Sequence, residues 1–182
     1  MALLEILTYP DPFLRTKCTP VQKISKDIVK LLDDMAETMY AAKGIGLAAS
    51  QIGSPHRVIV LDVRESEEGE NTKSASSLYK IINPTIIKSE GKSEGEEGCL
   101  SIPDIRENVV RMANVVVSGQ DVDGSNITIE ATGLLSVCLQ HEIDHLDGIL
   151  FIDRLSRLKR SMIKSKLKKH ILPNPSPHKL KL

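Results

Sequence analysis

A glutamate directly follows the first of two histidines spaced four residues apart, in the stretch QHEIDHLDG at residues 140–148. Residues four apart on an α-helix share one face, with Cβ atoms about 5–6 Å apart, so His141 and His145 could bind one metal ion. Glu142 is rotated about 100° from His141, which makes it a poor third ligand but lets it reach a water on the metal. Two ligands beside a general base predict metal-dependent hydrolytic chemistry.

The surroundings of this pair favour a metal site over chance. With five His and thirteen Glu in the chain, random placement yields the pattern in roughly one sequence per hundred. The pair is expected on a buried helix from Gly133 to Leu146, which Thr132 can cap and Gly148 can end. The turns before the histidines are almost wholly apolar, and burying ionisable groups without partners is costly. A metal ion would supply the partner.

A third ligand must come from elsewhere, and a thiol is the natural candidate. Cys138 shares the helix face but lies about 7.5 Å along the axis from the point midway between the histidines. Its short side chain cannot close that gap to a bond of about 2.3 Å, so Cys138 is predicted to be a pocket wall or a core thiol. Cys99, beside a glycine and ahead of strand-like residues, is favoured over Cys18, which has nothing near it to organise a site.

Two further helices are expected on either side of the central part of the chain. The first begins after the N-cap Ser25 and continues to about Lys43, with Gly44 as its stop. The second covers about residues 153–171 and is amphipathic. Its apolar side is predicted to carry Leu155, Leu158, Met162, Leu167 and Ile171.

The segments between the first and second helices read as strands. Residues 57–63 form a buried strand, residues 78–90 two short strands broken at Pro84, and residues 108–131 an antiparallel hairpin that turns at DVDG. Residues 65–77 are expected to be a polar loop. Strands without a βαβ rhythm predict an α+β fold, with antiparallel sheets packed around the central metal-binding helix and a helix near each terminus.

Composition limits the class of protein. A chain of 182 residues suits a single domain, here 1–153, followed by a basic helix and tail at 154–182. No apolar run approaches the roughly 18 residues of a membrane span. The first residues lack the basic segment of a signal peptide, so the cytoplasm is expected. Three cysteines are too few for a disulfide framework, which fits a reducing compartment. Nothing indicates more than a monomer.

Charge is unevenly distributed although the formal net charge is zero. Residues 62–107 hold eleven acidic side chains, whereas residues 154–182 hold ten Lys and Arg and no acid. A basic segment of this kind either binds an anionic partner or is an ordinary solvated helix face.

Three collinear stretches resemble the signature motifs of the peptide deformylase family: GIGLAASQ at 44–51, EGCLS at 97–101 and HEIDH at 141–145. The resemblance covers about residues 1–160 and implies removal of the N-formyl group from nascent polypeptides, releasing formate. It further implies that Cys99, His141 and His145 hold the metal and that Glu142 is the general base and later the acid. The Gln51 amide and the Leu100 backbone N–H would stabilise the oxyanion; taken alone, Gln51 would be an ordinary surface polar residue.

The resemblance also suggests where the substrate lies. Ile45, Gly46 and Leu47 would flank an extended peptide that is added as a β-strand. Further substrate contacts are expected at Glu97 and Gly98, and the methionine pocket at Ile45, Leu134, Val137 and Cys138. For Leu134, simple core packing is an alternative.

Metal identity and partners follow from the same resemblance. It implies Fe²⁺ as the native ion, although a site of one Cys and two His suits Zn²⁺ well, and Zn²⁺, Co²⁺ or Ni²⁺ could replace iron in purified protein. The basic C-terminal helix resembles the one with which bacterial deformylases dock on the ribosome near the exit tunnel, where RNA phosphates would suit its charge.

Two other functions compete with this hypothesis. A zinc endopeptidase of the HExxH type would need a third protein ligand after the helix, but no Glu follows His145, and His170 and His178 lie in the tail. A non-enzymatic, metal-stabilised ribosome-binding module would explain the basic helix. It would give no reason for Glu142 or Gln51.

Overall fold

The computed structural model describes residues 2–63 and 78–171. Its helices are α1 Lys26–Ala41, α2 Gly133–Leu146 and α3 Arg157–Ile171, with short 3-10 helices η1 Pro12–Arg15, η2 Ala49–Ile52 and η3 Phe151–Arg154. Its strands are β1 Gly46–Ala48, β2 Val58–Asp62, β3 Leu78–Glu90, β4 Ser93–Cys99, β5 Ile102–Arg111, β6 Asn114–Gln120 and β7 Asn126–Ala131. The predicted loop at 65–77 and the last part of the predicted basic tail, residues 172–182, lie outside the described residues.

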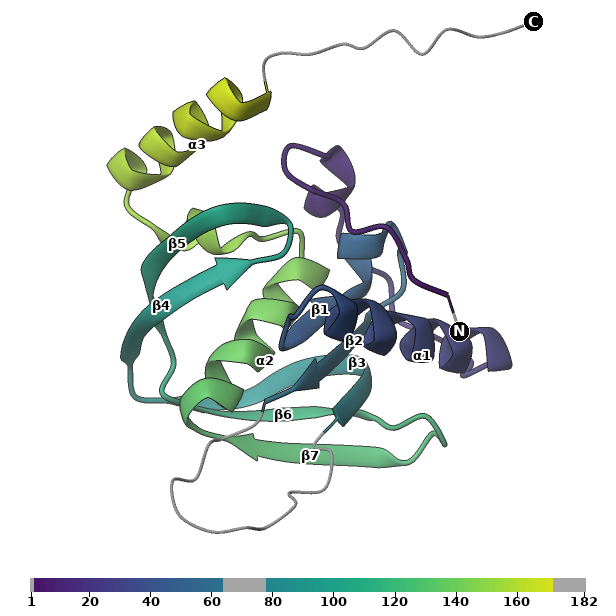
Figure 1. The fold of residues 1–182 in the computed structure, drawn as a ribbon. Coiled ribbons are helices and arrows are strands. Elements are labelled where there is room, and N and C mark those ends of the chain that lie inside the picture. The colour runs from purple at the N-terminus through teal and green to yellow at the C-terminus, as the bar shows by residue number, and fades with distance from the viewer. Residues whose placement is uncertain (1, 64–77, 172–182) are drawn as a thin grey trace, which may run out of the picture.

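Helix α2 lies between two antiparallel sheets (Figure 1). One is a five-stranded sheet in the order β1-β2-β3-β6-β7, and the other is the two-stranded ribbon β4-β5. Helix α1 packs on β1 and β2. The predicted α+β class with a central helix is thus confirmed. The helix has the predicted bounds and Thr132 is its N-cap residue, but the Thr132 side chain makes no capping hydrogen bond.

Helix α1 forms as predicted but ends earlier. Ser25 accepts a hydrogen bond from the Ile28 N–H through its side chain, which caps the first turn. The buried stripe includes Ile28, Leu32, Met35 and Met39. The helix stops at Ala41, and Lys43 adopts a left-handed φ of 56°. The Gly44 N–H then donates to the Met39 carbonyl, so the chain leaves the helix directly into the segment that precedes β1.

The prediction of two short strands broken at Pro84 was wrong, because β3 runs through the proline. The register between β3 and β6 shifts between Ile82 and Thr85, and Asn83 has a positive φ of 54°. An irregularity of this kind leaves a residue unpaired, so a proline, which has no N–H to donate, fits there without ending the strand. The Pro84 carbonyl accepts from Arg57 Nε at 3.2 Å.

The predicted hairpin at 108–131 begins too early. Residues 108–111 belong to β5 and pair with β4, and only β6 and β7 form the hairpin. Its turn is at the predicted place, closed by hydrogen bonds between Asp121 and Ser125 and from Gly124 to Asp121. The chain changes sheets at residues 112–113, where the Met112 N–H donates to the Gln140 side chain on α2. Alternation continues on both sides of this change, so the pattern alone could not reveal it.

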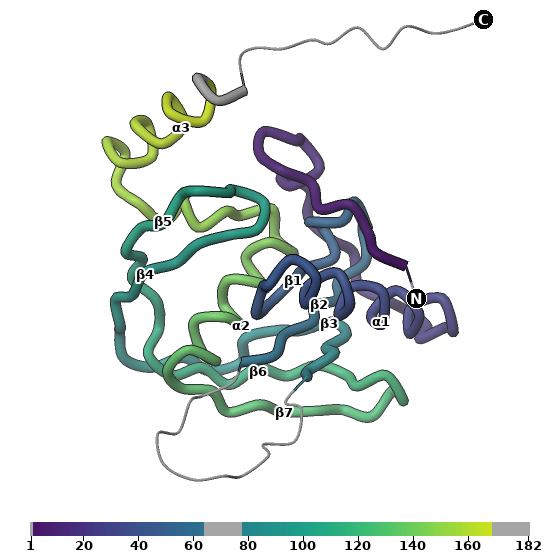
Figure 2. The backbone as a smooth tube through the Cα atoms, in the orientation of Figure 1, coloured from purple at the N-terminus to yellow at the C-terminus, as the bar shows by residue number. Residues whose placement is uncertain are grey.

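The C-terminal helix starts at Arg157, not at Asp153, because residues 151–154 form η3. Ile163 and Leu167 of α3 are buried in a cluster with Ile102, Ile105 and Val109 of β5. Figure 2 shows α3 on the side of the β4–β5 ribbon. Two residues of the predicted apolar side, Leu158 and Met162, are instead exposed (72% and 64%). No helix among the described residues is long and apolar enough to span a membrane.

Candidate active site

The three side chains predicted as metal ligands converge on one point. The Cys99 Sγ and a ring nitrogen each of His141 and His145 lie within 4.8 Å of one another. Cys99 Sγ and His145 Nε2 lie 3.1 Å apart. Cys99 ends β4, and both histidines project from one face of α2. The site therefore depends on how the β4–β5 ribbon is held against α2.

The other two thiols lie outside this cluster. Cys138 is buried one turn before His141, and its Sγ lies 3.7 Å from the Ile45 carbonyl oxygen. Cys18 is also buried, with its Sγ 3.8 Å from the carbonyl oxygen of Ser54. The helix geometry that excluded Cys138 as a ligand agrees with this arrangement.

A local irregularity in the ribbon directs Cys99 toward α2. The β4–β5 register shifts between Gly98 and Cys99, so that Gly98 pairs with Arg106 whereas Cys99 pairs with Ile102. A bulge of this kind bends a strand and re-aims the side chain beside it. The same tight connection carries Ser101, whose hydroxyl accepts a hydrogen bond from Gln51 Nε2 at 3.1 Å.

The donor set and its surroundings fit a divalent transition metal. Burial, with the nearby His141 and Arg111, lowers the pKa of His145 well below its usual value, so the imidazole is in the neutral form that binds metal. Burial would also lower the pKa of His141, but hydrogen bonds to Cys99 and Glu97 raise it well above its usual value, so the site favours positive charge. One thiolate and two imidazoles are ligands that zinc, iron and related ions accept.

A buried ion pair supports His141 from behind. The His141 Nδ1 lies 2.8 Å from Glu97 Oε2, and the same carboxylate accepts from Arg111 Nε at 2.7 Å and from a second Arg111 nitrogen at 3.0 Å. Burial would raise the pKa of Glu97, but the hydrogen bonds from Arg111 and His141 outweigh it and lower the pKa to about 2. The carboxylate is therefore ionised and holds the ring so that its Nε2 is available.

Glu142 is a buried carboxylate beside the candidate ligands. A Cβ atom built on Gly46 would lie 2.4 Å from Glu142 Oε1, so the carboxylate lies against the backbone of β1. Its Oε2 has no hydrogen-bond partner among the described residues. Burial raises the pKa of Glu142 to about 7. A group with this pKa can both accept and release a proton near neutral pH.

The side-chain amide of Gln51 is held in one orientation. Its Oε1 accepts from the Ala48 N–H at 2.9 Å. This leaves Nε2 to donate to Ser101 Oγ at 3.1 Å and to point at Cys99 Sγ, 3.6 Å away. The residue is buried in η2, which directly follows β1. An N–H donor therefore faces the candidate metal position, where an oxyanion could accept it.

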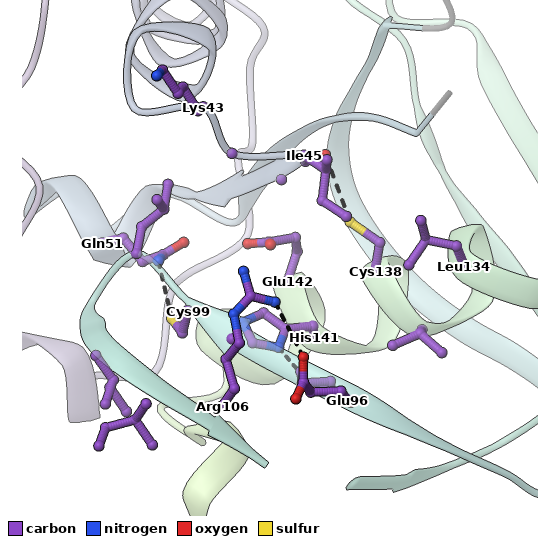
Figure 3. A pocket seen from close by; sticks show the side chains of 18 of the residues that line it. Lys43, Ile45, Gln51, Glu96, Cys99, Arg106, Leu134, Cys138, His141 and Glu142 are labelled. Atoms are coloured by element: carbon purple, nitrogen blue, oxygen red, sulfur yellow. Dashed lines mark hydrogen bonds and ion pairs between the residues drawn. The ribbon is translucent and has the colours of Figure 1, made fainter. Parts of the chain in front are cut away.

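These groups lie at a cavity of about 750 Å³. In Figure 3, Gln51 and Cys99 lie on one side, Ile45, Cys138 and Leu134 on the other, and Glu142 and His141 between them. Two predicted site residues do not line the cavity: Leu47 and His145 are both buried behind it. The predicted residues that do line it are Ile45, Gly46, Gln51, Glu97, Gly98, Cys99, Leu100, Leu134, Val137, Cys138, His141 and Glu142.

Part of the cavity wall was not predicted from the sequence, nor was the ion pair of Arg111 with Glu97 behind His141. The wall also includes Lys43, Gly44, Glu96, Ile102, Asp104, Ile105 and Arg106. Glu96 and Arg106 form an exposed ion pair across β4 and β5, at 3.5 Å. Their proximity follows from the register of the ribbon, which a single strand's sequence does not show. Arg111 was missed because nothing in its neighbourhood marks it as the partner of Glu97.

Comparison with known proteins places this geometry in a family. The family model for polypeptide deformylase matches residues 3–161. The chain belongs to the peptide deformylase family. The peptide deformylase of Syntrophobacter fumaroxidans is 49% identical over 171 residues, covering 94% of this chain and 97% of that protein. That of Alkalilimnicola ehrlichii is 51% identical over 169 residues, covering 93% and 91%.

Solved structures of the family have the same fold. The peptide deformylase of Ehrlichia chaffeensis, in complex with actinonin, matches with a TM-score of 0.86 at 41% identity, over 95% of this chain and 100% of that one. The enzyme of Legionella pneumophila matches with a TM-score of 0.82 at 43% identity, over 93% and 95%. Family membership makes this chain a metal-dependent hydrolase of N-formyl groups on nascent peptides. Neither the endopeptidase nor the non-enzymatic module is supported.

Gly46 is predicted to be indispensable because the carboxylate of Glu142 occupies the space where a side chain would begin. A Cβ at this position would lie 2.4 Å from Glu142 Oε1 and 2.9 Å from Cys138 Sγ. Gly46→Ala must displace both, so we expect a loss of about 1–3 kcal/mol in unfolding free energy and a large loss of deformylase activity. Urea unfolding and formate release would measure the two effects. Gly95→Ala is the control, because nothing lies within 4 Å of its Cβ position.

Proposed function

We propose that this chain removes the formyl group from the N-terminal formylmethionine of nascent polypeptides, with the roles divided among the three candidate ligands and the residues beside them. The carrying observation is the convergence of the Cys99, His141 and His145 donor atoms within 4.8 Å, beside the Glu142 carboxylate. Cys99, His141 and His145 are the metal ligands, Glu142 is the general base, and Gln51 with the Leu100 N–H stabilises the oxyanion.

A divalent metal ion held by these three ligands would polarise the formyl carbonyl and lower the pKa of a water molecule. We propose Fe²⁺ as the native ion, with Zn²⁺, Co²⁺ or Ni²⁺ as replacements. The thiolate donor fits all of these ions, so the ligand types do not select one. Metal analysis of protein purified without oxygen, paired with activity, tests the choice: iron at stoichiometric amounts supports it, and an inactive iron form contradicts it.

Glu142 moves the proton in the hydrolysis. Its carboxylate accepts a proton from water as the water oxygen bonds to the formyl carbon. It then gives that proton to the amine as the C–N bond breaks, which yields formate and a free N-terminus. Both transfers suit a group whose pKa burial raises to about 7. Glu142 lines the cavity, and its buried Oε2 has no partner among residues 2–63 and 78–171 that would compete for this proton.

Substrate would enter along β1. This strand is the first in the order of the five-stranded sheet, with β2 on one side, so its other edge can pair with an extended peptide. Ile45 and Gly46 line the cavity there, and Leu47 contributes backbone only, because its side chain is buried in the core. Leu134, Val137 and Cys138 of α2 form the wall that would receive the methionine side chain.

The proposal is tested by formate release from formyl-Met-Ala-Ser by the full-length protein, loaded with Fe²⁺ or Ni²⁺ without oxygen. We expect formate and a free methionine N-terminus, with acetyl-Met-Ala-Ser a poor substrate. Cleavage of an internal peptide bond would indicate the endopeptidase instead. Stoichiometric metal without any hydrolysis would leave only a metal-binding module, and either result would overturn the proposal.

The choice of thiol ligand gives a matched pair of variants. Cys99→Ser replaces the proposed thiolate with a weaker donor, so we expect loss of bound metal on dialysis and loss of deformylase activity. Cys138→Ser makes the same change at a thiol that contacts the Ile45 carbonyl oxygen instead. It should retain stoichiometric metal by elemental analysis. Equal metal loss in both variants would contradict the assigned ligand set.

We also propose that the protein works in the cytoplasm as a monomer, with a catalytic part at 1–153 and a basic segment at 154–182 that docks on the ribosome. The exposed residues of α3 support docking, because they include Lys166 and Lys168 as well as the apolar Leu158 and Met162. Deleting residues 160–182 would also remove the buried Ile163 and Leu167. Lys166→Gln with Lys168→Gln is therefore the sharper test. If this double variant co-sediments with ribosomes as the wild-type protein does, the docking proposal is wrong.

A further inference from the structure

A chain of charged side chains, buried except for Arg154 at its end, connects the candidate ligand His141 to the segment that precedes the C-terminal helix. It runs from His141 to Glu97, then to Arg111, then to Asp144 and finally to Arg154, the last residue of η3. The members come from α2, β4, β5 and η3. Neither the proton transfer nor the oxyanion contacts proposed above use Arg111, Asp144 or Arg154.

Arg111 joins the two elements that carry the metal ligands. Two of its nitrogens contact both oxygens of Glu97, at 2.7 and 3.0 Å, and its third donates to Asp144 Oδ2 at 2.5 Å. Glu97 lies two residues before Cys99 on β4, and Asp144 lies between His141 and His145 on α2. A planar guanidinium that grips both carboxylates fixes the ribbon and the helix relative to each other. The distance from thiolate to imidazoles therefore depends on Arg111.

Arg154 contacts the same Asp144 carboxylate as Arg111. Its Nε lies 2.9 Å from Asp144 Oδ2, and its terminal nitrogen lies 2.5 Å from Oδ1. Asp144 is thus held between two guanidinium groups. The Arg154 side chain is 42% exposed, whereas that of Arg111 is 2% exposed. Arg154 lies three residues before α3, so the network ends where the C-terminal helix begins.

We propose that Arg111 is a positioning residue for the metal centre. We further propose that Arg154 links the segment just before α3 to the same network. The network sets the alignment of Cys99 with the two histidines and thereby the retention of the metal. This inference rests on the proposed metal centre. It assigns to the base of the C-terminal helix a role in the active site that is separate from any docking by its exposed face.

The test is the loss of Co²⁺ from the full-length protein to excess chelator, followed through the cobalt–thiolate absorption bands. Arg111→Lys keeps the charge but offers one ammonium in place of the fork, which cannot hold two carboxylates in a fixed plane. We expect altered bands and about tenfold faster loss of Co²⁺, the lower end of what supporting residues contribute. Arg154→Met should fall between Arg111→Lys and wild type.

Lys159→Met is the matched control for Arg154→Met. Lys159 also ties α3 to the body, through a contact of 2.9 Å with Glu107 of β5, but it lies outside the network. It should lose Co²⁺ at the wild-type rate. If Arg154→Met does the same, the link to α3 is overturned. Should Arg111→Lys fail to fold, the difference between Arg154→Met and Lys159→Met decides.

A purely structural role for Arg111 gives a different result. Arg111→Lys would then lower the unfolding temperature of the metal-free protein but leave the Co²⁺ bands and the loss rate unchanged, which overturns the inference. Failure of the wild-type protein to take up Co²⁺ at all would instead overturn the proposed metal centre. The two failures are therefore distinguishable in one series of measurements.

Discussion

Glu142→Gln is expected to lower kcat for formyl-peptide hydrolysis by a factor of about 10²–10⁴, the usual contribution of a positioned general base. Glutamine fills the same space against Gly46 but cannot accept the proton from water. Because Glu142 is not among the three converging ligands, bound metal should remain at the wild-type stoichiometry. Steady-state kinetics and elemental analysis of the same preparation measure both quantities.

Stability should move in the opposite direction from activity in this variant. The wild-type protein buries a carboxylate with one oxygen unpartnered among the described residues, which is unfavourable for the folded state. Glu142→Gln removes the ionisable group and should unfold at the same or a higher temperature. Glu130→Gln makes the identical change on the exposed face of β7 and should alter neither property. Activity within tenfold of wild type, or loss of metal, would contradict the assigned role of Glu142.

Much of the site could be predicted from the sequence because its central part is local. The four-residue spacing of His141 and His145 needs only helix geometry, and the same geometry excluded Cys138 without any structure. Glu142 directly follows His141 in the sequence, so its position at the site follows from that of the histidine. Cys99 was favoured from its setting, and the collinear motifs then added Gln51 and Leu100.

The unpredicted parts depend on pairing between distant segments. Arg111 meets Asp144 of α2 across 33 residues of sequence, and its contact with Glu97 depends on the register of β4 and β5, which neither strand encodes alone. Pro84 was taken as a strand end because a bulge in the partner register cannot be seen in one strand. On α3, Met162 and Ile163 are adjacent and both apolar, so only the packing surface on β5 determines which of them is buried.

The residues that the sequence predicted and the residues that it did not predict have different roles at the site. The groups proposed to touch the substrate or the metal lie in short motifs, whereas the groups that hold those motifs at the correct distance come from separate elements. Figure 3 shows the first kind converging on the cavity. The second kind, exemplified by Arg111, lies behind the ligands. Substituting such a residue should weaken metal retention before it alters the catalytic step.

Gln51→Met should lower kcat by a factor of about 10²–10³, as removal of one oxyanion donor does elsewhere, with little change in KM. The Ala48 N–H holds the Gln51 Oε1 at 2.9 Å, so Nε2 is oriented toward Cys99 before any substrate arrives. Its contact with the Cys99 Sγ is long, at 3.6 Å, and an oxyanion can replace it at small cost. Methionine has a similar length but no N–H to donate.

The controls separate this donor from the amide's structural contact. Gln51→Met also leaves the buried Ala48 N–H unpaired, which should cost about 1–3 kcal/mol in unfolding free energy. Gln51→Glu keeps an oxygen for Ala48, so its stability should be higher than that of Gln51→Met, yet its ionised carboxylate donates nothing and kcat should fall as far. Ser101→Ala removes one partner of Nε2 and retains the donor, so its kcat should stay near wild type. A raised KM with unchanged kcat in Gln51→Met would show that the amide binds the ground state, and the oxyanion assignment would then be wrong.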